Sequence, residues 1–147
     1  SSWVAAGSTM AAYFDERALE GFSKWMSKQS KEEVEHSNEF YNYVLKRNGK
    51  VEFFALDKPR MDFKSVKEVF EATLAHEEAV TAAIEKIHKL ARELGDYGAE
   101  VFLNKFAEEQ EEEEEQVQKI IDKIVSLDID NNSATLYLLD KEMGARE

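Results

Sequence analysis

The sequence contains no cysteine, one proline and six glycines among its 147 residues. Without cysteine the chain can form neither disulfides nor thiolate metal sites, and a reducing, cytoplasmic compartment is compatible with it. The scarcity of helix breakers, together with abundant alanine, glutamate, lysine and leucine, favours a mostly helical protein. The length suits a single domain, residues 1–147, with a real hydrophobic core.

The sequence also lacks long apolar runs and an excess of basic residues. No run approaches the roughly 18 apolar residues that a membrane-spanning helix needs, and the first nine residues do not resemble a secretory signal. Acidic residues outnumber basic ones by 31 to 19, giving a formal net charge of −12. This composition argues against nucleic-acid binding and suits attraction of cations, although many helical proteins are acidic only for solubility.

Apolar spacing and stop signals predict five helices, which cover about residues 3–15, 19–47, 65–94, 97–127 and 134–143. The boundary signals are Asn48-Gly49, the capping box that begins at Ser65, Gly95, the cluster Asn131 to Ser133, and Gly144. Short joints predict two antiparallel hairpins, helices one with two and three with four.

The joint between helices two and three is much longer than the others. It runs from Lys50 to Phe63, includes Pro59 and has no helical period. At about 3.3 Å per extended residue it can travel the length of a long helix. One long crossover of this kind is typical of the ferritin-like four-helix bundle, which we predict with a short fifth helix at the C-terminus.

Three of the predicted helices carry apolar stripes that are interrupted by metal-ligand residues. Steps of three and four residues keep each stripe on one helix face. Ionised carboxylates on such a face are very unfavourable unless they are paired or bind a cation, so a metal centre is the simplest explanation. The stripes run Phe22, Met26, Gln29, Glu33, His36, Phe40, Val44; Val66, Phe70, Thr73, Glu77, Val80, Ile84, Ile87; and Phe102, Phe106, Glu109, Gln110, Glu113, Val117, Ile120, Ile124.

The candidate ligands are five residues from the middle of these stripes: Glu33, His36, Glu77, Gln110 and Glu113. Glu33 and His36 form a Glu-x-x-His pair, which alone is a weak signal, and a core histidine is the alternative. An oxygen-rich set with one imidazole suits iron or Mn, with Zn as a competitor. Bridging carboxylates would hold two ions about 3.5 to 4 Å apart.

Other polar residues flank this set. His76 points about 100° away from Glu77 around the helix and is expected to be packed or at the edge of the site. We expect Glu32, Glu109 and Glu112 to form a secondary cation position. The remaining acids of the glutamate run are expected to be solvated surface: Glu111, Glu114 and Glu115.

From Met10 to Glu147 the chain resembles non-haem ferritins of bacteria and archaea. The matching stretches are Met10–Asp15, Gly21–Met26, Glu32–His36, His76–Glu77, Phe102–Leu103, Glu109–Glu113 and Leu139–Glu142. The resemblance implies a five-helix subunit of a hollow 24-subunit shell that stores ferric mineral. It also implies a ferroxidase centre that oxidises Fe(II) with dioxygen or peroxide.

The resemblance also implies roles for individual residues. Glu33 would bridge both irons and His36 would bind the first. Glu77 and Glu113 would bind the second, with Gln110 placing the oxidant or a ligand. The third, looser iron site would comprise Glu32, Glu109 and Glu112, and the fifth helix would sit at a fourfold axis.

The chain departs from the family pattern at three places. The family's helix-one Glu ligand aligns to the position before Ser1, so helix one is expected to be truncated or altered at its N-terminus. A family Tyr aligns with Gly7, and a Trp of many relatives is Lys105, whose ammonium would compete with a cation.

Three alternatives to an active ferritin follow. One is a structural subunit that is catalytically impaired. A rubrerythrin-like or bacterioferritin-like oxidase would need a second Glu-x-x-His where Gln110 and Glu113 stand. A non-metal bundle would need basic residues on the stripes, which carry too few.

Overall fold

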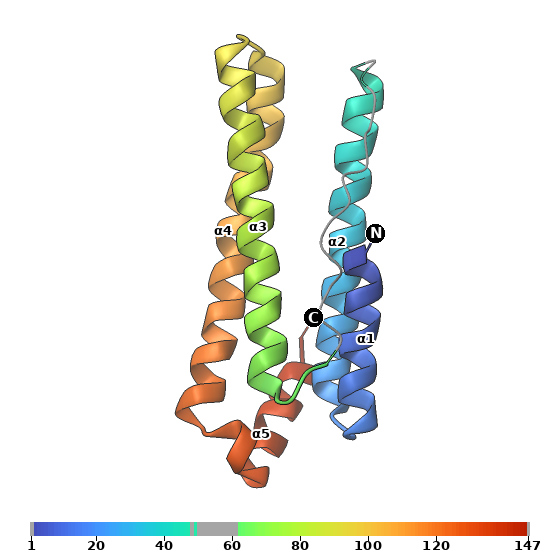
Figure 1. The fold of residues 1–147 in the computed structure, drawn as a ribbon, viewed down its shortest axis with the longest axis vertical. Helices are drawn as coiled ribbons and strands as arrows, with labels where there is room; N and C mark the ends of the chain where they lie inside the picture. The colour runs from blue at the N-terminus through green and yellow to red at the C-terminus, as the bar shows by residue number, and fades with distance from the viewer. Residues whose placement is uncertain (1, 48, 50–61, 147) are drawn as a thin grey trace. The chain divides into compact units, whose positions relative to one another are not determined.

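The computed structural model describes residues 2–47, 49 and 62–146, and all regular structure within them is helical (Figure 1). The elements are α1 (Ser2–Glu16), α2 (Glu20–Lys46), α3 (Val66–Glu93), α4 (Tyr97–Ser126), the 3₁₀ turn η1 (Ile129–Asn131) and α5 (Ser133–Gly144). They form two compact units, one of α1, α2 and α5 and one of α3, α4 and η1. The five helices match the predicted ranges closely, whereas η1 was not predicted. The described residues do not include the predicted stop at Asn48 or the part of the crossover from Lys50 to Met61. They also do not include the side chain of Trp3, the first residue of the first predicted helix.

In the first unit, α1 and α2 form the predicted antiparallel hairpin (Figure 1). Ala18 adopts a left-handed conformation (φ 58°), and the Leu19 amide donates to the Phe14 carbonyl at 2.9 Å. This tight turn brings the Phe14 and Phe22 rings into a stack with centroids 5.2 Å apart. Both rings are fully buried, and so are Met10 and Met26, which lie four residues from Phe14 and Phe22 on the same two helices.

The start of α2 depends on α5. Leu19 stands at the N-cap and has no side chain able to cap, so the first amides of α2 need partners from elsewhere. The Asp140 carboxylate of α5 accepts from the Phe22 amide at 2.9 Å. The helices approach closely because position 21 is glycine; a Cβ there would collide with the Asp140 carbonyl and the Gly144 amide.

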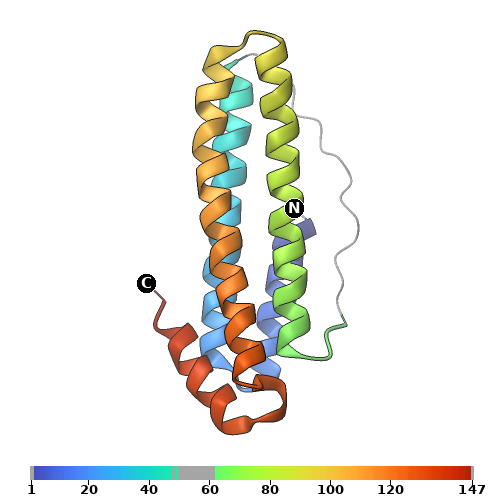
Figure 2. The ribbon, with the colours of Figure 1, turned by 90° about the vertical axis from the view of Figure 1, so that its left-hand side faces the viewer.

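In the second unit, α3 and α4 lie side by side and antiparallel (Figure 2). Ser65 caps α3 by accepting from the Glu68 amide at 3.1 Å, as the capping box predicted. At the other end Gly95 has φ 68°, the left-handed stop expected there. Asp96 then caps α4 through the Ala99 amide at 3.1 Å.

The turn η1 closes this hairpin at the end away from Gly95. Asp128 takes a left-handed conformation with φ 50° and leads into η1. The Asp130 carboxylate accepts from the Val66 and Lys67 amides at 2.9 and 3.2 Å. A residue of η1, the turn that comes after α4, therefore provides a second cap for α3. Among the described residues, no helix is long and apolar enough to cross a membrane.

The predicted stripes lie largely on buried or half-buried faces. The first stripe, which lies on α2, is buried from Phe22 to Gln29 and half-buried from Glu33 to Val44. The third is buried or half-buried throughout. On the second stripe, which lies on α3, the prediction that Ile87 shares the buried face was wrong, because Ile87 is exposed. The buried face of α3 continues instead from Ile84 to Ala91, seven residues further along.

Candidate metal centre

Glu77 is the most deeply buried acidic side chain of the second unit, with no exposed surface. It lies in the middle of α3, at the point where the apolar stripe is interrupted. One turn earlier the buried Thr73 hydroxyl donates to the Val69 carbonyl at 2.9 Å. A polar group at this depth needs a partner, and an ionised one needs strong compensation.

Gln110 of α4 provides a partner for Glu77. Its amide nitrogen donates to a Glu77 carboxylate oxygen at 3.0 Å and to the Glu77 backbone carbonyl at 3.1 Å. It also lies 3.3 Å from the Thr81 hydroxyl. The amide is 3 % exposed, so these bonds form in a nearly dry environment. Two predicted site residues from different helices are thus brought together, and the carboxylate is held in one orientation.

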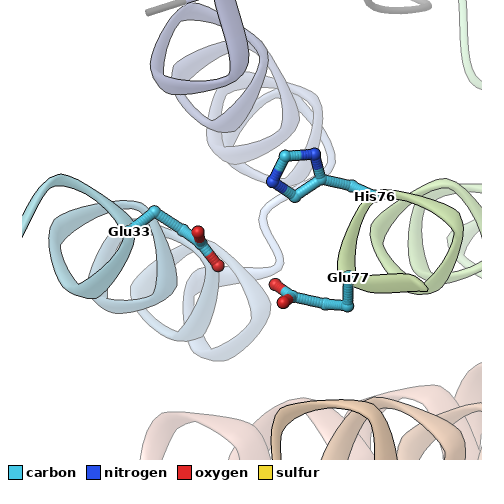
Figure 3. Close-up of side chains that lie close together, drawn as sticks. All are labelled: Glu33, His76 and Glu77. Atoms are coloured by element: carbon cyan, nitrogen blue, oxygen red, sulfur yellow. The ribbon is translucent and has the colours of Figure 1, made fainter. Parts of the chain in front are cut away.

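His76 precedes Glu77 on α3 and is half-buried (Figure 3). One of its ring nitrogens lies within 4.8 Å of a Glu77 carboxylate oxygen. Burial lowers the pKa of His76 below its usual value, and the negative charge of Glu77 opposes part of that shift. A neutral imidazole keeps a nitrogen lone pair that can bind a metal ion. His76 therefore joins the candidate ligands, although the sequence placed it only at the edge of the site.

In the first unit, Glu33 and His36 lie one turn apart on α2 and both are half-buried. The spacing predicted this shared face. Figure 3 includes the Glu33 side chain, which leaves α2 with its carboxylate at the end of an extended stem.

The glutamate run of α4 divides between buried and exposed faces. Glu109 and Glu113 are half-buried, and Glu111 and Glu112 are exposed. Glu115 is exposed and pairs with Lys119 at 2.7 Å, which lowers its pKa, as expected for surface.

Glu114 contradicts the prediction that it is plain surface. It is half-buried and accepts from the Thr81 hydroxyl of α3 at 3.2 Å. The prediction failed because Thr81, one turn after Glu77 on α3, faces α4 and bonds the Glu114 carboxylate. The apolar period of α4 alone does not reveal this partner on another helix.

Two further predicted positions have defined partners. The half-buried Glu32 carboxylate lies 3.1 Å from the Arg146 guanidinium. Lys105 is exposed, with its ammonium 5.8 Å from the Phe106 ring centroid.

Comparison with known proteins places the chain in a class. Residues 7–127 match the family described as the ferritin-like domain. The chain therefore belongs to the ferritin family. This membership confirms the predicted all-α, ferritin-like fold class with a short C-terminal helix.

Individual relatives agree with this assignment. The chain is 39 % identical over 137 residues to the bacterial non-heme ferritin of Staphylococcus aureus (strain USA300), spanning 93 % of this chain and 81 % of that protein. The corresponding protein of Staphylococcus haemolyticus (strain JCSC1435) gives the same figures.

Solved structures agree as well. An open pore ferritin from the hyperthermophilic archaeon Archaeoglobus fulgidus matches with TM-score 0.89 and 33 % identity, over 98 % of this chain and 88 % of its own. A closed form of that ferritin, engineered by site-directed mutagenesis, matches with the same TM-score and identity over 98 % and 87 %. The relatives reported carry ferritin names, so a rubrerythrin-like oxidase is not favoured.

Proposed function

We propose that this chain is the subunit of an iron-storage shell, which oxidises Fe(II) at a carboxylate centre and keeps the Fe(III) as mineral. Membership of the ferritin family supports this function. The observation that carries the proposal for the centre is the buried Glu77, oriented by Gln110. A neutral amide orients a carboxylate without neutralising its charge, and a bound cation favours the ionised form.

The donor groups fit iron as the substrate. The set contains carboxylates, an amide and imidazoles: Glu33, His36, His76, Glu77, Gln110 and Glu113. Such an oxygen-rich set suits Fe(II), Fe(III) and Mn, and Zn is a plausible surrogate in binding experiments. Glu33 would bridge two ions, with His36 on the first and Glu77 and Glu113 on the second.

The reaction is a two-electron transfer between substrates. Two Fe(II) ions each lose one electron, and dioxygen takes up both electrons with two protons and leaves as hydrogen peroxide. When peroxide is the oxidant, the same electrons and two protons convert it to two water molecules. The chain contributes the placement of the ions and a dry acidic site, in which Gln110 keeps the Glu77 carboxylate in the binding orientation.

We further propose that the chain assembles with copies of itself into a closed shell of 24 subunits. The neighbouring structures include an open pore and an engineered closed form of an archaeal ferritin, and this likeness supports a cage. Electron microscopy of the purified protein should show hollow, roughly spherical particles. Predominantly monomeric or dimeric protein would contradict this part of the proposal.

The centre is tested by anaerobic titration with Fe(II) followed by exposure to air. The wild-type protein should oxidise iron at least about tenfold faster than Glu77→Ala and than a Glu33→Ala, His36→Ala double variant. Even the residues that only orient metal ligands typically change metal affinity or activity by about 10–100-fold when mutated, and these three residues are proposed to bind the ions directly. The matched control is Glu71→Gln, which removes an exposed acid from the same helix as Glu77. Equal oxidation rates in all four proteins would refute the proposed centre.

A further inference from the structure

Arg146 follows α5, and its side chain returns to α2 in the first unit. One guanidinium nitrogen donates to the Trp25 carbonyl at 3.2 Å. The other donates to the Gln29 amide oxygen at 3.0 Å and to the Glu32 carboxylate at 3.1 Å. The guanidinium carbon also lies 4.5 Å from the Trp25 ring centroid. One planar cation therefore contacts three residues of α2, each about one helical turn from the next.

These contacts make the ion pair with Glu32 unlike an exposed surface pair. The Arg146 and Glu32 side chains are 13 % and 32 % exposed, so water screens their attraction only partly. A pair between two mobile exposed side chains contributes little, because both must be ordered to form it. Here the ring of Trp25 and the amide of Gln29 already fix the guanidinium.

We propose that Arg146 is a built-in counter-ion that competes with metal cations for Glu32. This inference rests on the proposed function, because it concerns the acid next to Glu33 in the sequence. A metal ion and the guanidinium both require the Glu32 carboxylate, and they repel each other at short range. Arg146 therefore weakens cation binding at Glu32, and iron occupies the ligand set around Glu77 in preference. Arg146 is a positioning residue and contacts no reacting atom.

The test uses Zn²⁺, which has no redox chemistry, in calorimetric titrations of the assembled, metal-free protein. Arg146→Gln removes the charge and keeps an amide that can donate to the Trp25 carbonyl. It should raise the Zn²⁺ affinity of one class of sites by about tenfold, the factor expected when a hydrogen-bonded charged competitor is lost. The gain should vanish when Arg146→Gln is combined with Glu32→Gln. The matched control is Arg92→Gln, which breaks the ion pair between Glu100 and the 75 % exposed side chain of Arg92 and should change nothing.

If the sites that depend on Glu33 and Glu77 still bind Zn²⁺, an unchanged Zn²⁺ affinity in Arg146→Gln refutes the role of Arg146 and leaves the proposed function intact. A gain that persists without the Glu32 carboxylate refutes it as well. If those two glutamates bind no Zn²⁺ even in the wild type, the proposed function is wrong and this inference fails with it.

A wild-type crystal soaked in Zn²⁺ covers the case in which the variant does not fold. The proposal expects anomalous density near Glu33 and Glu77, and an intact pair between Arg146 and Glu32. Zn²⁺ on the Glu32 carboxylate with Arg146 still in contact would overturn it.

Discussion

Replacing Gln110 with leucine tests whether the buried amide stabilises the carboxylate of Glu77. The substitution keeps a side chain of similar size and removes the donor 3.0 Å from the Glu77 oxygen. Leaving a buried acceptor without its donor costs about 1–3 kcal/mol, and more when the acceptor is charged. The second bond, to the Glu77 backbone carbonyl, adds little because the Thr81 hydroxyl also lies 3.0 Å from that oxygen and shares its one proton between it and the Glu114 carboxylate. We therefore expect the metal-free protein to lose about 2–3 kcal/mol of unfolding free energy, a large part of the 5–15 kcal/mol typical of a domain.

The chain contains a matched control for this substitution. Gln118 lies on the same helix and donates to the Asp122 carboxylate at 2.9 Å, but the pair is exposed to water. Gln118→Leu should therefore change the unfolding free energy by less than about 0.5 kcal/mol. Denaturant unfolding of both variants at one protein concentration, with a chelator present, measures the difference. Equal losses in the two variants would refute the reasoning, because burial would then not strengthen the bond.

Two other substitutions test the contacts that organise the units. Gly21→Ala should lower the unfolding free energy by about 1–3 kcal/mol, since overpacking against Asp140 outweighs the gain in helix propensity. Its control is Gly98→Ala, at the exposed second position of α4, which should be neutral or stabilising by up to about 1 kcal/mol. Thermal unfolding in which Gly98→Ala is less stable than Gly21→Ala would contradict this. Asp130→Ala should cost about 1 kcal/mol and speed amide exchange at Val66, because a cap of α3 is lost. Unchanged exchange there would show that Ser65 alone suffices.

Much of the fold followed from local patterns in the sequence. The spacing of apolar residues predicted five helices, and Ser65 and Gly95 marked the ends of α3 because their roles need only neighbouring residues. The same spacing placed Glu77 and Gln110 inside the unit, where the structure has them. The ferritin assignment drawn from the motifs is also confirmed.

What the sequence did not reveal depends on contacts between distant residues. The cap of α2 comes from Asp140, 118 positions after the amide that it serves, and the partner of Glu32 is Arg146, 114 positions away. No local period encodes such pairs. Glu114 was predicted to be surface for a related reason, because the period of α4 does not show that Thr81 of α3 reaches it. The assignment of individual ligands remains a prediction.

The two caps supplied from a distance also set an order in which the molecule can be completed during synthesis. The second unit is one continuous stretch of chain, so α3 receives its cap from Asp130 as soon as α4 and η1 have left the ribosome. The beginning of α2 waits longer, because Asp140 belongs to α5, which is synthesised after α4 and η1. Until α5 arrives, the nascent α1–α2 hairpin exposes the surface around Gly21 that α5 will cover, and this is the interval in which it is most open to unwanted association.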